Sequence, residues 1–397
     1  MASHTPPHLQ LRLSVMMFFQ FFTWGTWLIT LGTYLLQTLH FSGREVGMIY
    51  ATNAIAATIS PPLMGLLADR LFSANRLMVV LHFLGGLCLL GAYQSTTFIW
   101  VYLFMLGFNL CYVPTFSLST SLSFHHLPEP NKEFPRIRVW GTIAWIVTSL
   151  MLSWLAIEAK ATPLLIGGVA SILFAGYNLS LPHTPPSPGF NWTNLRGEDV
   201  QRLLRDRKLI IVIVSISLIC LPGSFYYSFL NPFLNEVGMK NAAAKMSIGQ
   251  VFEIFVVLAM PWFFAKLRFR TIFFWGFAVW GLRYLAFAVG RPGTWTEIFL
   301  YLGIAVQGFA FAWTNLAAQL YVNSQVPDFL RSTAQGVVTF ASLGLGFFIG
   351  SNLAGEVVRF YTISEGVHDW QSIFIIPATI GCLVAMGFWW WLPRMQE

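Results

Sequence analysis

The chain has 397 residues, of which 56% are hydrophobic and only 10% are charged, whereas a typical soluble domain has about 25% charged residues. A chain this apolar cannot cover its surface with polar groups, so part of that surface must face lipid. The net charge of +7 lies in short segments between apolar stretches, which excludes the extended basic face that nucleic-acid binding requires.

Twelve stretches are long and apolar enough for membrane-spanning helices, which need about 20 such residues. In the first half of the chain they are 13–36, 46–67, 77–94, 98–120, 139–157 and 162–181. In the second half they are 208–233, 244–265, 271–289, 296–321, 333–357 and 370–392. Prolines and charges between the sixth and seventh stretches forbid a continuous span. The sequence therefore predicts an all-α membrane protein with an N-terminal six-helix bundle (1–181), a cytoplasmic linker (182–207) and a C-terminal six-helix bundle (208–397).

The placement of the 23 Lys and Arg residues predicts the orientation in the membrane. With the N-terminus in the cytoplasm, most of them fall in cytoplasmic segments and few in outer loops, as the positive-inside rule requires. Only Arg283 lies within a span. We therefore expect a multi-pass protein of the cytoplasmic membrane with both termini in the cytoplasm.

Two loops indicate an internal repeat. Residues 61–70 and 261–270 each contain a proline near a helix end followed by a basic turn, which is typical of transporters built from two related bundles. In the first loop, Gly65, Asp69 and Arg70 form a tight turn with an acid and a base. We expect this turn to make charge links that break and re-form during gating; the alternative is a plain basic turn with a helix cap.

Glu253 is the one acidic residue of sixteen in the middle of a predicted span. Ionisable groups at membrane depth are costly and usually functional. Gln250 lies three residues earlier and so on the same helix face. Glu253 is therefore a candidate for ligand binding or proton transfer; the alternative is a structural partner for Arg283.

Polar and aromatic residues share helix faces in four other places. These groups are Arg138, Thr142 and Trp145; Gln307, Phe311 and Asn315; Gln20, Thr23, Trp24 and Trp27; and Tyr226, Tyr227 and Asn231. Amides and aromatic rings together favour an uncharged, polar, planar ligand, because ring faces stack and amides pair with ring edges. For Arg138 the alternative is a side chain that extends to the membrane interface.

No catalytic motif is present: there is no phosphate-binding loop, no Gly-x-Ser-x-Gly and no His-Glu-x-x-His. The four cysteines lie in apolar stretches without metal-ligand spacing, and the adjacent His125 and His126 point to different helix faces. We therefore expect no enzymatic activity, no metal and no cofactor. The expected partners are a small substrate and the lipid bilayer, and we expect a monomer.

Gly-x-x-x-Asp-Arg at 65–70 and twelve spans in two halves resemble the major facilitator superfamily. Longer motifs resemble its bacterial nucleoside:proton symporter branch. They are Trp-Gly-Thr-Trp (24–27), Phe-Pro-Arg-Ile-Arg-Val-Trp-Gly-Thr-Ile (134–143), Glu-Val-Gly-Met-Lys-Asn (236–241), Gly-Gln-Val-Phe-Glu-Ile (249–254) and Arg-Ser-Thr-Ala-Gln-Gly (331–336).

The resemblance implies nucleoside uptake coupled to proton entry through alternating access. It also implies a pocket formed by Arg138, Thr142, Trp145, Tyr227, Gln250, Glu253, Gln307 and Phe311. The family usually has an aspartate after the aromatic residue of the tenth helix, but here Ala312 follows Phe311. Glu253 then remains as the candidate proton-coupling acid. An uncoupled nucleoside facilitator and a sugar or glycoside transporter of the same fold are the alternatives.

Overall fold

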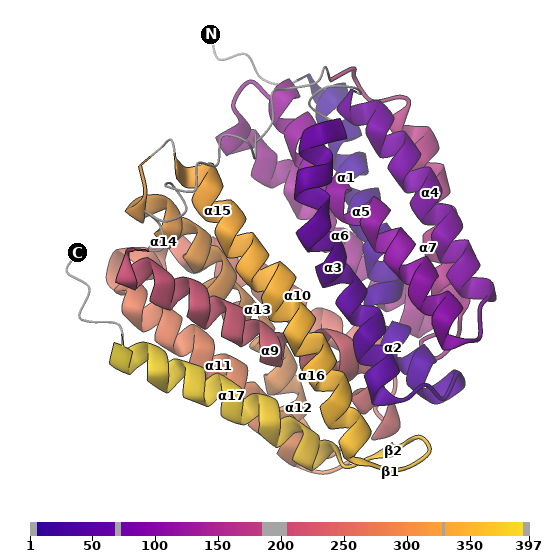
Figure 1. Ribbon diagram of the computed structural model, residues 1–397, viewed down its shortest axis with the longest axis vertical. Helices are drawn as coiled ribbons and strands as arrows, with labels where there is room; N and C mark the ends of the chain where they lie inside the picture. Colours follow the sequence, from indigo (N-terminus) through magenta and orange to yellow (C-terminus); the bar gives the residue numbers. More distant parts are fainter. Residues whose placement is uncertain (1–5, 68–72, 185–204, 328–329, 392–397) are drawn as a thin grey trace. The chain divides into compact units, whose positions relative to one another are not determined.

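The computed structural model of the protein describes residues 6–67, 73–184, 205–327 and 330–391. Its contacts divide the chain into two compact units (Figure 1). Unit 1 comprises Met1–Leu39 and Ile55–Trp192, and unit 2 comprises His40–Ala54 and Thr193–Glu397. The predicted linker at 182–207 lies mainly outside the described residues, so the predicted bundle boundaries remain a prediction.

Unit 1 is helical throughout its described part. Its elements are α1 (Pro7–Leu28), α2 (Leu31–Thr33), η1 (Tyr34–Thr38), the second half of α3 (Gly43–Leu67), α4 (Ala74–Gln94), α5 (Phe98–His126), α6 (Pro130–Trp154) and α7 (Thr162–Asn178). The first half of α3 belongs to unit 2. This helix thus begins in one unit and ends in the other.

In the described part of unit 2, the regular structure is helical apart from one short hairpin. Its helices are α9 (Arg207–Glu236), α10 (Ala242–Lys266), α11 (Phe269–Val289), α12 (Glu297–Ala305), α13 (Gln307–Phe311), η3 (Ala312–Leu316), α14 (Ala317–Gln325), α15 (Arg331–Thr339), η5 (Phe340–Gly346), α16 (Phe347–Phe360) and α17 (Trp370–Trp391). Strands β1 (Thr362–Ser364) and β2 (Val367–His368) pair antiparallel before α17. The hairpin was not predicted.

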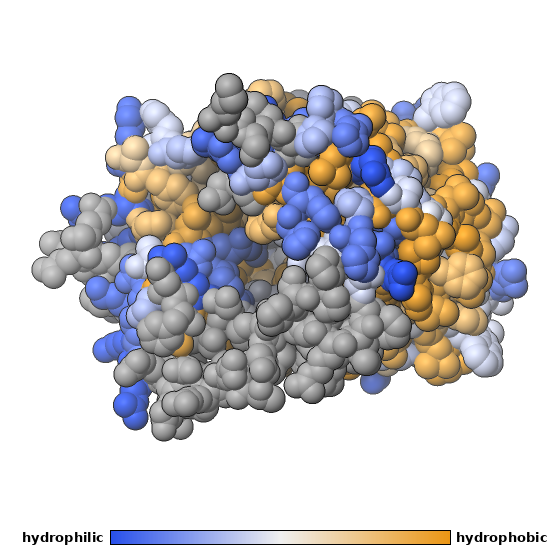
Figure 2. Space-filling view, turned by 90° about the horizontal axis from the view of Figure 1, so that it is seen from above, coloured by the Kyte–Doolittle hydropathy of each residue, from blue (hydrophilic) through white to orange (hydrophobic). Residues whose placement is uncertain are grey.

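Ten helical segments of the described chain are long and apolar enough to cross a membrane. The two remaining predicted spans coincide with α3, which has 25 residues, and with α7, a shorter apolar helix of 17 residues. Large apolar side chains such as Trp154, Leu173 and Leu258 are exposed. In Figure 2 hydrophobic residues dominate the right-hand side, while hydrophilic residues gather on the face toward the viewer. The chain is a multi-pass helical membrane protein.

The two units repeat the same packing scheme. In unit 1, α4 packs against α5 and α7, and α1 packs against α6 and α7. In unit 2, α11 packs against α12 and α17, and α9 packs against α16 and α17. These are the same pairs when the six predicted spans of each half of the chain, rather than the individual helices, are counted in order. The packing therefore supports the internal repeat expected from the two proline-containing loops.

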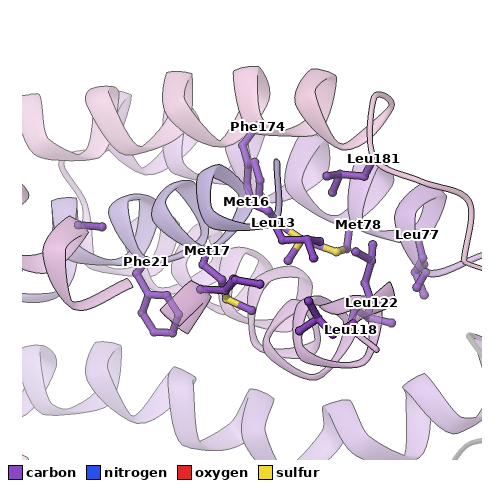
Figure 3. Close-up of a cluster of buried hydrophobic side chains, with 14 residues drawn as sticks. Leu13, Met16, Met17, Phe21, Leu77, Met78, Leu118, Leu122, Phe174 and Leu181 are labelled. Carbon is purple, nitrogen blue, oxygen red and sulfur yellow. The ribbon is translucent and has the colours of Figure 1, made fainter. Parts of the chain in front are cut away.

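Apolar side chains of several helices form the core of unit 1. Figure 3 shows Met16 and Met17 of α1 near Leu118 and Leu122 of α5, with Phe174 of α7 beside them. All five are at most 5% exposed. Because lipid is as apolar as leucine, such contacts stabilise the bundle through close packing rather than through removal from water.

Pairs of glycines let the first half of α3 approach α16 within unit 2. A Cβ atom on Gly47 would lie 2.4 Å from the Ser351 carbonyl oxygen, and one on Gly355 would lie 2.6 Å from the Gly43 carbonyl oxygen. Small residues at such spacing permit backbone contact between membrane helices. Glu356 on α16 pairs with Arg44 on α3 at 3.1 Å, so the contact combines close packing with an ion pair.

The hairpin region is held to α9 and α17 by two acidic residues. Glu236, at the end of α9, accepts a hydrogen bond from the backbone nitrogen of His368 and contacts the ring Nδ1, both at 2.7 Å. Asp369 accepts from the backbone nitrogen of Ser372 at 3.2 Å and from its hydroxyl at 2.6 Å. These two bonds hold the pKa of the Asp369 carboxyl below its ordinary value. Asp369 thus stabilises the start of α17.

Candidate substrate site

The predicted residues of α6 form a half-buried cationic and aromatic face in unit 1. The Arg138 guanidinium lies over the Phe21 ring of α1, with its carbon 4.0 Å from the ring centroid. Trp145 packs edge-on against Trp24 at 5.3 Å between centroids. Arg138, Thr142 and Trp145 are all partly exposed, whereas Ile137 and Ala144 on the neighbouring face of α6 are buried. The stripe predicted from the spacing is thus one face of α6.

Gly141 makes room for this arrangement. A Cβ atom there would lie 2.6 Å from the Phe21 ring and 2.7 Å from an Arg138 nitrogen. Any larger residue would therefore displace the guanidinium from the ring. The glycine positions Arg138 as a cation held against an aromatic face, which is a geometry suited to contacting a polar ligand.

Behind Trp24, unit 1 contains a buried polar network that the sequence analysis missed in part. Gln20 was assigned to a polar stripe of the first helix, but His82, Tyr112, Thr115 and Ser171 were not singled out. Each of the five is at most 1% exposed. Buried polar groups in a membrane protein are costly unless they are paired. His82, a lone histidine in the apolar stretch 77–94, is therefore the feature of the sequence that points to this network.

Hydrogen bonds connect these five residues in a defined order. The Gln20 amide nitrogen donates to the Thr115 hydroxyl at 2.6 Å, and His82 Nε2 lies 3.1 Å from Gln20 Oε1. Since that amide oxygen only accepts, His82 Nε2 carries a proton and donates. On the other side, Ser171 donates to the His82 carbonyl at 2.8 Å, and Tyr112 donates to the Gln20 carbonyl. The network links α1, α4, α5 and α7.

In unit 2, two glycines bring α10 and α13 into backbone contact. A Cβ atom on Gly308 would lie 2.5 Å from the Cα of Glu253, and one on Gly249 would lie 2.9 Å from the Ile304 carbonyl oxygen. This approach brings the backbone of Glu253 against α13, and Gly249 against the side chain of Gln307. Glu253 is half-buried, and the Gln250 side-chain oxygen has no hydrogen-bond partner among the described residues.

Arg283, the cation within a span, is buried in unit 2. It is 2% exposed, and its guanidinium carbon lies 4.1 Å from the Tyr226 ring centroid and 5.2 Å from that of Trp280. Its Nη1 donates to Gln307 Oε1. In the described part of the chain its hydrogen-bond partner is thus an amide rather than the Glu253 carboxylate considered from the sequence. Aromatic rings and one amide offset the cost of burying this cation.

Gln307 also contacts Tyr227, so Arg283, Gln307 and Tyr227 form one chain of hydrogen bonds. The Gln307 amide nitrogen donates to the Tyr227 hydroxyl at 3.5 Å. Gln307 is buried while Tyr227 is partly exposed. Tyr226 is buried against the Arg283 guanidinium. Asn231 is also buried, and its amide nitrogen contacts the Met246 sulfur at 3.8 Å.

The tenth predicted span is interrupted around the site. A turn at Val306 separates α12 from α13, and the π-helical segment η3 begins directly after Phe311 and contains Asn315. Single π-helical turns often lie at functional sites. Ala312 starts this turn and is fully buried. Phe311 and Asn315 are partly exposed, so both side chains of the predicted stripe remain accessible.

The predicted gating turn is only partly described. Gly65 lies near the end of α3, while Asp69 and Arg70 lie outside the described residues, so the gating role of all three remains a prediction. Within the described ranges, no group of three or more His, Cys, Asp and Glu side chains has the arrangement of a metal site.

Residues 8–394 match the Nucleoside H+ symporter family. The chain belongs to this family. One relative, the putative nucleoside transporter YegT of Escherichia coli (strain K12), is 35% identical over 392 residues, which cover 95% of this chain and 92% of that protein. The xanthosine permease of the same organism is 32% identical over 397 residues, covering 96% and 95%. The resemblance drawn from the sequence motifs is thus confirmed.

The fold of this nucleoside H+ symporter is also that of a solved relative. The crystal structure of the nucleoside transporter NupG matches with a TM-score of 0.90 at 30% sequence identity, over 98% of this chain and 100% of that one. The predicted helical transporter fold is therefore confirmed in its general form. The count of twelve spans and the roles of individual residues are not decided by this match.

Proposed function

We propose that this chain takes up nucleosides across the cytoplasmic membrane together with protons, by alternating access. The observation that carries the proposal is the meeting of α10 with α13 in a member of the nucleoside H+ symporter family: Gly249 and Gly308 bring the helix of Gln250 and Glu253 beside Gln307. An acid and two amides at membrane depth suit a ligand rich in hydroxyls and ring nitrogens.

Each unit has its own proposed binding residues. In unit 1 they are Arg138, Thr142 and Trp145; in unit 2 they are Tyr227, Gln250, Glu253, Gln307, Phe311 and Asn315. In each unit, the aromatic side chain (Trp145 or Phe311) suits stacking on a base, and the polar groups suit the edge of a base or the ribose. The half-buried Arg138–Phe21 pair supports a role in binding rather than at the interface.

Glu253 is the proposed proton-linked residue. Its half-buried position on α10 and the alanine at 312 support this assignment, because Ala312 supplies no carboxylate at the start of η3. The second candidate function, an uncoupled nucleoside facilitator, is favoured by the same alanine. Transport of sugars or glycosides by the same fold has no observation of its own in its favour.

We further propose twelve spans, both termini in the cytoplasm and a monomeric transporter. The ten long apolar segments together with α3 and α7 support the count. The Gly65, Asp69 and Arg70 turn is the proposed cytoplasmic gating element.

Accumulation of labelled uridine in proteoliposomes tests the proposal. With an inward proton gradient, the parent protein should concentrate uridine above the external level, and a protonophore should remove the excess. Glu253→Gln should abolish accumulation, whereas Glu297→Gln, a matched change in the first turn of α12, should preserve it. Uptake that never exceeds the external level would instead establish the uncoupled facilitator, and uptake of sugars but not uridine would refute the substrate class.

A further inference from the structure

The hydrogen bonds from Arg283 to Tyr227 all point in one direction. A guanidinium has five N–H donors and no acceptor, so the Gln307 atom that Arg283 contacts must be the amide oxygen. This chemistry fixes the orientation of the Gln307 amide, because a flipped amide would set donor against donor. The Gln307 nitrogen therefore faces Tyr227.

Tyr227 receives a hydrogen bond and keeps its own proton for another partner. Its hydroxyl accepts from the Gln307 nitrogen at 3.5 Å. The Tyr227 O–H makes no hydrogen bond of its own to a described residue, and the Glu253 carboxylate is the neighbouring negative charge. Arg283 and Gln307 are both 2% exposed, whereas Tyr227 is partly exposed. Of Arg283, Gln307 and Tyr227, Tyr227 is thus the residue that a ligand can reach, and its O–H group is the donor that it presents.

The surroundings of Tyr227 favour a base rather than a ribose. Its ring packs against Tyr226 at 5.3 Å and against Phe347 at 5.9 Å between centroids. Aromatic groups of this kind suit a planar ring. A ribose hydroxyl both donates and accepts, so it would not distinguish one orientation of Tyr227 from the other.

We propose that Arg283 sets Tyr227 as a hydrogen-bond donor and thereby selects nucleosides whose base presents a carbonyl oxygen over those that present an amino group at the same position. Uridine and inosine have the carbonyl; cytidine and adenosine have the amino group. With an amino group facing it, Tyr227 would accept a second bond and its proton would stay unpaired. An unsatisfied buried donor lowers affinity about tenfold to a hundredfold. This inference rests on the proposed nucleoside transport.

Binding of matched nucleoside pairs to the purified full-length protein tests the inference. Thermal-shift titrations with uridine and cytidine, and with inosine and adenosine, give the ratio of dissociation constants within each pair. We expect uridine and inosine to bind about tenfold or more tightly than their amino partners. Equal binding within both pairs, or tighter binding of cytidine and adenosine, would overturn the inference but leave nucleoside transport intact. No response to any nucleoside would instead contradict the proposed function.

Two variants locate the origin of the preference. Tyr227→Phe removes only the hydroxyl and should bring both ratios close to one. Arg283→Gln replaces a pure donor with an amide that also accepts, which frees Gln307 to reorient, so the ratios should fall while the Tyr227 hydroxyl is retained. A ratio unchanged in Arg283→Gln would refute the positioning role of Arg283. If that variant does not fold, the parent and Tyr227→Phe measurements still decide.

Discussion

The two units share a packing scheme but contain different buried polar chemistry. The network of unit 1 consists of one amide, one imidazole and three hydroxyl groups, and its members bond to one another and to backbone carbonyls. The chain in unit 2 starts at a guanidinium and ends at the partly exposed Tyr227. The first network is closed within the unit, whereas the second leads to a surface.

This difference indicates a division of roles within a repeated architecture. A closed, fully buried network ties helices together, because removing one member leaves another unsatisfied. The hydrogen-bonded chain of unit 2 starts at the fixed charge of Arg283 and ends at the accessible hydroxyl of Tyr227. It can therefore determine whether that hydroxyl offers a ligand a donor or an acceptor. Changes in the buried network of unit 1 should therefore alter stability, and changes in the Arg283–Gln307–Tyr227 chain of unit 2 should alter transport and selectivity.

The largest effect should come from Gly308→Ala. The added methyl group would lie 2.5 Å from the Cα of Glu253, and backbone atoms cannot move aside as the end of a flexible side chain can. We expect nucleoside uptake to fall at least about tenfold and stability to fall by about 1–3 kcal/mol. Uptake assays and thermal unfolding measure both quantities.

Gly387→Ala is the matched control for this change. Gly387 lies in α17 of the same unit, and a Cβ atom there would meet nothing within 4 Å. The Gly387→Ala variant should therefore retain the nucleoside uptake and the stability of the parent protein. Equal activity of Gly308→Ala and Gly387→Ala would show that close approach of α10 and α13 is not needed for transport.

A smaller effect, confined to stability, is expected from His82→Phe. An aromatic ring is retained, but the Gln20 amide oxygen Oε1 loses its donor in a fully buried site. We expect a loss of about 1–3 kcal/mol in unfolding free energy with an unchanged uridine-to-cytidine affinity ratio. Thermal unfolding and ligand titration on one preparation measure both. A changed ratio would contradict the division of roles between the two networks.

Gly141→Ala should have a more modest effect, and on binding. The methyl group would force apart the Phe21 ring and the Arg138 guanidinium, whose attraction contributes about 0.5–1 kcal/mol. Nucleoside affinity should weaken by about threefold, measured by titration. Unaltered affinity would indicate that the position of Arg138 against Phe21 does not contribute to binding.

The smallest effect concerns a charge outside the spans. The pKa of Asp369 is lowered in the folded protein, so its contribution to stability is present above the ordinary aspartate pKa and is lost as the pH falls through the lowered value. Between pH 5 and pH 3 (about the range in which aspartate titrates), the parent should lose slightly more thermal stability than Asp369→Asn. Identical pH profiles would show that this carboxylate does not stabilise α17.

Much of the fold could be predicted from the sequence because spans, loops and positive charges follow simple rules. Apolar length located helices in all twelve predicted stretches, and Gln250 with Glu253 followed from helical spacing. The interruptions of the tenth span could not be predicted, since no proline marks Val306 and a π-helical turn leaves the apolar pattern unchanged. They depend on how tightly α10 and α13 pack.

Partners of buried polar groups were harder to predict than the groups themselves. Arg283 stands out in the sequence as a cation within a span. Its hydrogen bond goes to Gln307, 24 residues further along the chain, whereas the Glu253 carboxylate is the more obvious candidate for its partner. His82 could not be recognised in the same way, because a neutral histidine within an apolar stretch resembles an ordinary buried side chain. One sequence gives the type of each side chain, whereas its partner depends on the three-dimensional packing of several helices.

Direct measurement of proton movement during nucleoside entry tests the central claim. Proteoliposomes containing a pH-sensitive dye, with equal pH on both sides, receive external uridine while labelled uridine uptake is followed in parallel. The account predicts that the interior acidifies in proportion to uridine entry with the parent protein and does not acidify with Glu253→Gln. Uridine entry without acidification in the parent, or acidification that is unchanged in Glu253→Gln, would contradict it.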